Sequence, residues 1–413
     1  MRIGMLTQWY DPEPGPASLP GALARGLVAR GHEVRVVTGF PNYPTGEIAD
    51  GYTQSRRMDE VLDGVHVRRV AVYASHDGST VKRMANYGSF AGSAYASGLG
   101  ALRGVDALWV NYSPVTIGLP MFAQLRRHGT PTVVHALDLW PDTLFASGFA
   151  DGAGPGRFIH ASLDRWTNRM YRKADKVAYI SPGVGEVLAR RGVPTSKLAY
   201  APMWADEAAF QFSKPSDDRS SFEVPDDHTL LVYAGTLGSA QDLSSLVRAV
   251  AQVRDSPLTC LIAGSGTEEE GLRTLAKGEG ATNLRFLGRL GRSEMRHLMA
   301  ASDVHFVGLN SHPLAKITMP SKIQSILASG RAIVGTLEGD AADVVRAAGG
   351  WTVAPGDVAA LANVLREVAD AGRDDVIRRG AAFRRVYDKQ FSYSLGVSRV
   401  EALLEDAVAG RCP

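Results

Sequence analysis

Residues 230–239 read Leu230-Leu-Val-Tyr-Ala-Gly-Thr-Leu-Gly-Ser239. A short apolar run of this kind is typical of a buried strand, and the two glycines allow a tight turn into the helical pattern that follows from about residue 239. The same order of strand, glycine turn and helix returns at 258–277, with Gly264 and Gly266 in the turn. Repeated units of this type predict a parallel sheet covered by helices.

The alternation extends in both directions from this stretch. Downstream, strands are predicted at 284–287, 303–308 and 332–336, and helices at 293–301 and 320–328. Upstream, the first half of the chain carries a separate series of the same kind. Its strands are predicted at 2–8, 33–38, 65–71, 106–111, 131–136 and 176–180, and its helices at about 18–30, 79–103, 114–127, 157–173 and 183–191.

A polar segment, 205–227, lies between the two series and is typical of a linker. A chain of 413 residues also exceeds one ordinary hydrophobic core. We therefore predict an α/β protein with two facing Rossmann-like doubly wound domains, 1–204 and 205–390, followed by a helical segment, 391–413. Because open α/β sheets bind ligands at the carboxyl ends of their strands, we expect the active site in the cleft between the two domains.

Composition narrows the class of protein. Hydrophobic residues make up 45% of the chain and charged residues 21%, which is typical of a globular protein and excludes a disordered or fibrous one. The formal net charge of +2 gives no electrostatic argument for nucleic acid. Two cysteines support neither a disulfide framework nor a zinc quartet. Glycines, polar residues and prolines interrupt the charge-free windows 84–102 and 107–125, so neither is expected to span a membrane.

Several residues of the second half are candidates for holding the phosphates of a ligand. Glycine turns let a ligand approach the backbone, and the helix N-terminus that follows attracts an anion. Lys322, near the start of the predicted helix 320–328, is unfavourable for the helix dipole, which indicates a bound diphosphate. The structural alternatives to phosphate binding are that the glycines serve only to form tight turns and that Lys322 is an exposed lysine without a role. The candidates are Gly235, Thr236, Gly238, Gly264, Gly266, Lys316, Thr318, Met319, Pro320, Ser321 and, with a catalytic role as well, Lys322.

In the first half, polar residues follow the predicted strand 131–136. Asp138 would accept or orient a hydroxyl proton, and His135 is a second catalytic candidate. His135 could instead be a hydrogen-bonded histidine of the core, and Trp140 could serve only in packing. The Pro- and Gly-rich loop 7–16 lacks the glycine fingerprint of a dinucleotide site, but its place after the first strand favours a role in lining the cleft.

The segment Gly31-His-Glu-Val-Arg-Val-Val-Thr-Gly-Phe-Pro-Asn-Tyr-Pro-Thr45 resembles the GT4 glycosyltransferases of the WbuB/WcaI type, which have the GT-B fold. As a set the matching segments are specific for GT4, and they extend from residue 1 to about 390. The other matching segments are Asp138-Leu-Trp-Pro141, Tyr233-Ala-Gly-Thr-Leu-Gly238, Pro320-Ser-Lys-Ile-Gln-Ser325, Leu327-Ala-Ser-Gly330 and Ala354-Pro-Gly-Asp357.

This resemblance implies a retaining transfer of a hexosyl or N-acetylhexosaminyl group from a UDP-sugar, without a cofactor or an obligatory metal ion. The sequence contains no Asp-x-Asp motif, which a metal-dependent glycosyltransferase of the GT-A type would carry. In the family the donor lies on the C-terminal domain, which adds Gly288, Arg289 and Ser325 to the donor candidates. The acceptor enters from the N-terminal domain, onto which 391–413 packs back. The acceptor candidates are Gly15, Asn42, Tyr43 and Trp140.

Two departures from the GT4 pattern affect the donor and acceptor sites. The family commonly carries a Glu-x7-Glu pair, and those positions here are Ile317 and Ser325, so the carboxylate that usually binds the ribose is missing. Leu137 stands where many members have histidine. The region 79–103, which contacts lipid acceptors in some relatives, is rich in alanine and glycine behind Lys82 and Arg83 and is a poor membrane inserter.

Two other functions are compatible with this sequence. One is a UDP-sugar 2-epimerase-like enzyme of the same fold, and the other is a non-catalytic sugar-nucleotide-binding partner of a transferase. A NAD-dependent dehydrogenase is disfavoured because the first strand lacks the glycine fingerprint. We expect a saccharide, lipid-linked or small-molecule acceptor and no nucleic acid. The expected location is the cytoplasm, with at most a peripheral contact with the inner face of the membrane.

Overall fold

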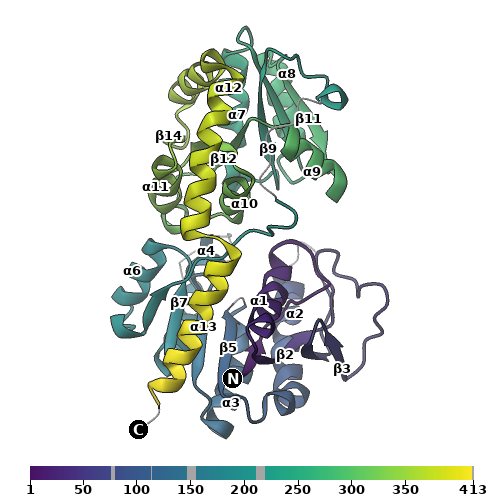
Figure 1. The fold of residues 1–413 in the computed structure, drawn as a ribbon, viewed down its shortest axis with the longest axis vertical. Helices are drawn as coiled ribbons and strands as arrows, with labels where there is room; N and C mark the ends of the chain where they lie inside the picture. The colour runs from purple at the N-terminus through teal and green to yellow at the C-terminus, as the bar shows by residue number, and fades with distance from the viewer. Residues whose placement is uncertain (76–79, 113, 147–154, 211–218, 412–413) are drawn as a thin grey trace. The chain divides into compact units, whose positions relative to one another are not determined.

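The computed structural model describes residues 1–75, 80–112, 114–146, 155–210 and 219–411. The chain divides into two compact units (Figure 1). The first unit comprises residues 1–202 and 394–413, and the second unit comprises residues 203–393. Part of the predicted linker, 211–218, lies outside the described residues. Within the part of the chain that is described, we find no helix with the length and apolar character needed to cross a membrane.

The first unit contains an eight-stranded sheet in the order β3-β4-β2-β1-β5-β6-β7-β8. All neighbouring strands are parallel except β3, which is antiparallel to β4. The strand order reverses at β1, which pairs with β2 on one side and β5 on the other, so the switch point lies between β1 and β5. The strands are β1 (Arg2–Leu6), β2 (Glu33–Gly39), β3 (Arg57–Leu62), β4 (Val65–Val70), β5 (Ala107–Tyr112), β6 (Thr132–Ala136), β7 (Lys176–Tyr179) and β8 (Leu198–Tyr200).

Helices connect these strands, and one predicted helix changes its hydrogen-bonding type along its length. The helix expected at 79–103 is helical over its described residues, but its type changes: α2 ends at Ser93 and is followed by a π-helical turn, η2 (Ala94–Gly98), and a 3-10 turn, η3 (Leu99–Leu102). Gly98 approaches β2 so closely that a Cβ atom would lie 2.6 Å from Val37. The helices are α1 (Leu19–Ala29), α2 (Thr80–Ser93), α3 (Gly118–His128), α4 (Asp142–Ala146), α5 (Pro155–Lys173), α6 (Pro182–Arg190) and, mostly within this unit, α13 (Tyr393–Ala409).

The last helix is attached to the first unit by charged side chains. Arg30 and His32 both contact Glu401, at 2.5 Å and 2.7 Å. Farther along the chain, Arg411 forms an ion pair with Asp175 over 2.6 Å. The end of the chain therefore returns to the unit in which it began (Figure 1).

The second unit contains a six-stranded sheet that is parallel throughout, in the order β11-β10-β9-β12-β13-β14. This is the strand order of a Rossmann fold, with its switch point between β9 and β12. Ala234 is level with Ala263 in the ladder, so β9 and β10 end side by side. The strands are β9 (Thr229–Ala234), β10 (Leu258–Ala263), β11 (Leu284–Gly288), β12 (Val304–Gly308), β13 (Ala332–Thr336) and β14 (Trp351–Val353).

The helices of the second unit pack against this sheet around a core of aliphatic side chains. Five elements were not expected from the sequence: α11, α12 and β14 of this unit, and the edge strands β3 and β8 of the first unit. Gly372, with φ of 75°, interrupts the helical conformation of α12. The helices are α7 (Leu243–Gln252), α8 (Glu269–Glu279), α9 (Arg292–Ala301), α10 (Ser321–Ser329), α11 (Gly339–Ala347) and α12 (Val358–Gln390).

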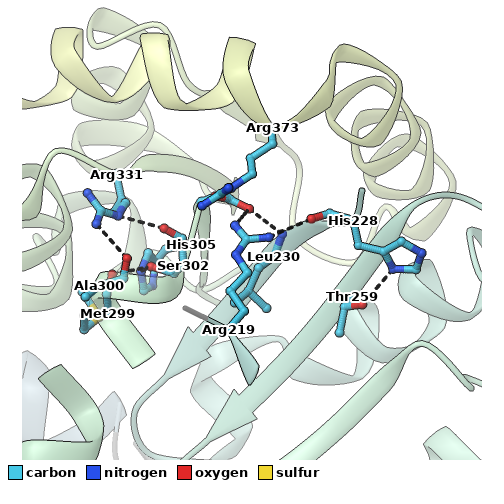
Figure 2. Close-up of polar contacts among 11 residues, drawn as sticks. Arg219, His228, Leu230, Thr259, Met299, Ala300, Ser302, His305, Arg331 and Arg373 are labelled. Atoms are coloured by element: carbon cyan, nitrogen blue, oxygen red, sulfur yellow. Dashed lines mark hydrogen bonds and ion pairs between the residues drawn. The ribbon is translucent and has the colours of Figure 1, made fainter. Parts of the chain in front are cut away.

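A buried polar cluster lies at the amino ends of β9 and β12 (Figure 2). Asp303 is 1% exposed and accepts hydrogen bonds from Arg219, from the Leu230 amide over 2.8 Å and from Arg373 over 3.1 Å. Arg219 also donates to the carbonyl of His228 over 2.9 Å. These bonds attach residue 219 and α12 to the edge of the sheet opposite the carboxyl ends, so we assign the cluster a structural role.

Candidate functional site

Two glycine turns contact each other at the carboxyl edge of the second sheet. Gly235 follows β9 with φ of 151°, and Gly264 follows β10 with φ of 144°. A Cβ atom on Gly264 would lie 1.8 Å from the carbonyl oxygen of Gly235, and one on Gly266 would lie 2.2 Å from that of Leu237. Only glycine fits at these positions, because the two turns pack backbone against backbone.

The hydrogen bonds of these turns determine which amides are available to a ligand. Gly235 donates to Ala263 over 2.9 Å, Leu237 to Ser265 over 3.0 Å, and Gly264 to Gly288 over 2.7 Å. The amides of Gly235 and Gly264, which were expected to meet a phosphate, therefore serve the sheet. The N–H groups of Thr236, Gly238 and Gly266 have no acceptor among the described residues, and they are the ones that a phosphate can use.

Lys322 lies against the first of these turns. Its Nζ donates to the hydroxyl of Tyr233 over 3.2 Å and lies 4.3 Å from the centroid of that ring. A Cβ atom on Gly235 would be only 2.9 Å from the same nitrogen. Burial lowers the pKa of Lys322 to about 8. No carboxylate of the described residues lies within ion-pair distance, so the charge of this half-buried ammonium group is left for an anionic ligand.

Tyr233 itself was not identified from the sequence. Its hydroxyl donates to the carbonyl of Thr236 over 2.5 Å, which connects the strand end to its own turn. Burial raises the pKa of this hydroxyl, so it remains a neutral donor that does not compete for the lysine proton. The available signal was its position two residues before Gly235, at the end of a strand.

The other donor candidates differ in burial and in hydrogen bonding. Met319 is 5% exposed and its side chain packs into the core, so only its backbone is left to contact a donor. Thr318 and Ser325 donate to backbone carbonyls of their own segment, over 2.7 Å and 3.4 Å. Pro320 precedes α10 as its N-cap residue. The remaining donor candidates are exposed or half-buried along the sheet edge, and they are Thr236, Gly238, Gly288, Arg289 and Ser321.

A carboxylate contacts Lys316, the residue before position 317, where the GT4 pattern expects the first glutamate. Glu338 follows β13, and its Oε2 lies 3.3 Å from the Nζ of Lys316. The charge of Lys316 is thereby balanced, which weakens its case as a phosphate ligand. Ile317 and Ser325 carry no such group. Glu338 was missed from the sequence, although its position just past a strand end was a usable signal.

The carboxyl edge of the first sheet carries a network of side-chain amides at its switch point. Asn111 donates to the hydroxyl of Thr7 over 2.9 Å, and Gln8 donates to Asn86 over 2.5 Å. The side-chain oxygens of Gln8 and Asn111 are buried and have no partner among the described residues. Buried polar atoms without partners are uncommon in proteins, and an ordered water can satisfy them.

Glu13 joins the two loops that border this network. Its carboxylate is 4% exposed and accepts the backbone N–H groups of Tyr10, Asn42 and Tyr43 over 3.0, 2.8 and 2.9 Å. Burial raises the pKa of Glu13, and the three backbone donors oppose that rise. The loop after β1 and the loop after β2 are thus held together by the side chain of Glu13. From the sequence, no role was expected for Glu13 beyond its place in a Pro- and Gly-rich loop.

The side chains of three candidates in the first unit belong to the interior. His135 is 1% exposed, its Nε2 lies 2.7 Å from the carbonyl oxygen of Ala201, and burial lowers its pKa to about 4. Asn42 is 4% exposed and donates to Phe40 over 2.9 Å. Trp140 is 7% exposed. The core and packing alternatives therefore hold for His135 and Trp140, and Asn42 shapes its own loop.

The remaining candidates of the first unit lie at or near the surface. Asp138 is half-buried directly after β6. Burial raises the pKa of Tyr87 and of Tyr112, and the negative charge of Asp138 contributes to both shifts. Gly15 is exposed with φ of 66°, and Tyr43 is half-buried. Among the described residues, no three His, Cys, Asp or Glu side chains are grouped in a way that would hold a metal ion.

Comparison with known proteins agrees with this architecture. Residues 15–204 match the family described as the glycosyl transferase 4-like domain, and residues 228–371 match the glycosyl transferases group 1. The chain is 29% identical to WcaI of Escherichia coli, whose name describes it as a putative glycosyl transferase of colanic acid biosynthesis. The match extends over 336 residues, which is 80% of this chain and 81% of that protein.

Solved structures resemble the whole chain in fold. Sucrose-phosphate synthase from Thermosynechococcus elongatus aligns with a TM-score of 0.73 and 17% identity over 99% of both chains. The HepE protein of Anabaena, in complex with UDP and glucose, aligns with a TM-score of 0.69 and 16% identity over 98% of this chain and 99% of that one. At these identities the likeness establishes the fold alone.

Proposed function

Because the chain belongs to the GT4 glycosyltransferases, which have the GT-B fold, we propose that it is a retaining enzyme that uses a UDP-sugar as donor. It transfers a hexosyl or N-acetylhexosaminyl group to a hydroxyl of a saccharide, a lipid-linked saccharide or a natural product. The HepE complex with UDP and glucose supports a UDP-linked donor by analogy of fold. The observation that carries the proposal is the uncompensated ammonium group of Lys322 at the switch point of the second sheet.

The donor diphosphate is held at the carboxyl edge of the second unit. Lys322 supplies one positive charge, and the N-terminus of α10 and the free amides of the Gly235 and Gly266 turns supply hydrogen bonds. As the bond between the sugar C1 and the diphosphate oxygen breaks, negative charge grows on the diphosphate. A fixed cation in a half-buried site stabilises that charge without reorganisation, which is often the largest contribution to catalysis.

The acceptor binds at the carboxyl edge of the first unit. Asp138 orients the acceptor hydroxyl, whose oxygen forms the new bond to C1 on the same face of the sugar from which the diphosphate departs. The hydroxyl proton passes to the departing diphosphate oxygen, so that charge and atoms balance. We place the enzyme in the cytoplasm, with at most a peripheral contact with the membrane.

The test measures the hydrolysis of a UDP-sugar by the protein in the absence of any acceptor. Slow hydrolysis of UDP-glucose or UDP-N-acetylglucosamine, monitored by proton NMR, is expected to release UDP and the sugar first as its α-anomer. Release of the β-anomer would contradict a retaining mechanism. Conversion to a 2-epimer would indicate an epimerase, and UDP binding without turnover of any sugar nucleotide, even with mixed saccharide acceptors, would indicate a non-catalytic partner protein.

A further inference from the structure

A basic groove lies on the face that α3, α5 and η2 form in the first unit. Its volume is about 820 Å³, and its lining contains five cationic side chains and no acidic one. Arg126 and Arg127 come from the end of α3, and Arg169 and Lys173 from the end of α5. The fifth cation, on Arg411, is already paired with Asp175.

The other four cations of the basic groove have no carboxylate partner among the described residues. Two of them stack on aromatic rings: the guanidinium of Arg127 lies 5.0 Å from the centroid of Tyr95, and that of Arg169 lies 5.2 Å from Phe122. Stacking holds a guanidinium group in place without neutralising it. Four neighbouring unpaired cations create a local positive potential that attracts anions.

The same two helices expose apolar side chains toward their N-terminal ends. Phe158 is 79% exposed, Ile159 is 43% exposed and Leu119 is 41% exposed. On α5, residues 158, 165 and 169 follow helical spacing, so Phe158 lies on the same stripe as two arginines. The surface is therefore apolar at one end and cationic at the other.

We propose that this surface docks on an anionic lipid bilayer. The headgroup phosphates bind in the basic groove, and Phe158, Ile159 and Leu119 enter the interfacial region, an arrangement typical of peripheral membrane proteins. A second copy of the chain is a poorer occupant, because an isologous contact would place arginine against arginine. Nucleic acid is also disfavoured, because isolated aliphatic side chains such as Ile159 do not stack on bases.

The apolar end of the docking surface lies near the amide network at the carboxyl edge of the first sheet. Because α3 follows β5, its N-terminal end and Leu119 lie near the carboxyl edge, where Asn111 is located. A lipid-linked saccharide anchored in that bilayer would thus present its sugar at the acceptor edge, so docking favours this acceptor class over the soluble ones. That refinement rests on the proposed function, whereas docking itself does not. The surface involved is not the region 79–103 of the sequence analysis, apart from Tyr95.

Vesicle sedimentation with the full chain tests the proposal. Vesicles of equal parts phosphatidylglycerol and phosphatidylcholine should bind the protein, pure phosphatidylcholine should not, and binding should weaken as salt is raised from about 50 to about 500 mM. The double variant Arg126→Glu/Arg169→Glu should bind anionic vesicles at least about tenfold more weakly. The matched control is Arg57→Glu/Arg103→Glu, which reverses two exposed charges elsewhere on the first unit. Phe158→Ser should weaken the binding that remains at high salt.

Three outcomes would overturn the docking proposal. The first is an equal loss of vesicle binding in the control variant, which would indicate a generic attraction. The second is no binding to anionic vesicles by a folded protein. The third is binding of single-stranded RNA, but not of vesicles, that disappears in the Arg126/Arg169 variant. UDP titration of the same samples keeps the two proposals separate, because the docking variants should bind UDP as the wild type does.

Discussion

The ammonium group of Lys322 lies over the ring of Tyr233, 4.3 Å from its centroid, and donates a 3.2 Å hydrogen bond to the hydroxyl of that residue. The two residues come from α10 and β9, which are far apart in the chain. Tyr233 thus holds a cation against the glycine turn at the switch point of the sheet. A cation held in this way is already positioned before a diphosphate arrives.

The affinity for UDP should fall at alkaline pH. Burial lowers the pKa of Lys322 to about 8 in the free protein, so the ammonium form predominates at pH 7 and is the minor form at pH 9. Since only the charged form attracts the diphosphate, affinity should drop roughly tenfold for each pH unit above 8. Lys322→Arg stays charged over this range and should show a flat profile. Calorimetric titrations at pH 7, 8 and 9 check this, and a wild-type affinity that is constant with pH would contradict it.

Replacing Gly264 by alanine should abolish UDP binding while the protein still folds. The new Cβ atom would lie 1.8 Å from the carbonyl oxygen of Gly235, so the two turns must separate. Gly278→Ala is the matched control, because nothing lies within 4 Å of its Cβ position in α8. This control should bind UDP normally and gain up to about 1 kcal/mol of stability from helix propensity. Normal UDP affinity in Gly264→Ala would show that the turn does not contact the nucleotide.

Glu13→Ala should loosen the loops of the first unit without affecting the donor site. Three backbone N–H groups, two of them buried, would lose their acceptor, which typically costs about 1–3 kcal/mol for each unsatisfied buried group. Hydrogen exchange should therefore accelerate across 40–46, and the melting temperature should fall. Glu47→Ala, an exposed carboxylate of the same loop, should change neither. Unaltered exchange in Glu13→Ala would show that the loops are held by other contacts.

Acidification should destabilise the fold through its buried histidines. Burial lowers the pKa of His135 to about 4 and that of His305 to about 3, whereas both titrate near 6.5 in the unfolded chain. Between these values the unfolded chain binds protons that the native protein excludes, so stability is lost as pH falls below about 6.5. His305→Gln should show a shallower decline of melting temperature from pH 7 to 4.5. The same slope as in the wild type would contradict this assignment.

The sequence predicted the strands of both sheets well where they are apolar runs between turn residues. It missed β3, which is half exposed and alternates along an edge, and the three-residue strands β8 and β14. Short edge strands bury little surface, so the hydrophobic pattern on which the prediction depends is weak there. The change from α-helix to π-helical and 3-10 turns at the end of the predicted helix 79–103 was not expected, because no local pattern in the sequence indicates it.

The residues of the candidate site also divide into those that a local sequence pattern indicates and those that depend on distant contacts. Gly264, Gly266 and Lys322 carried local signals, because a glycine after a strand and a lysine at a helix start are each unusual for the element itself. Glu13 and Tyr233 act through partners distant in sequence, 30 residues away in the case of Tyr43 and 89 in the case of Lys322. His135 was misassigned because a strand end next to polar residues does not reveal which way the side chain points.

Titration of UDP by calorimetry, with Lys322→Ala beside the wild type, tests the central claim most directly. Lys316→Ala serves as the control, since the charge of Lys316 is balanced by Glu338. The account predicts that UDP binds the wild type in preference to GDP-mannose and dTDP-glucose, at least about tenfold more weakly to Lys322→Ala, and nearly unchanged to Lys316→Ala. A folded protein that binds no UDP, or that binds it equally well without Lys322, would contradict the assignment of the donor site.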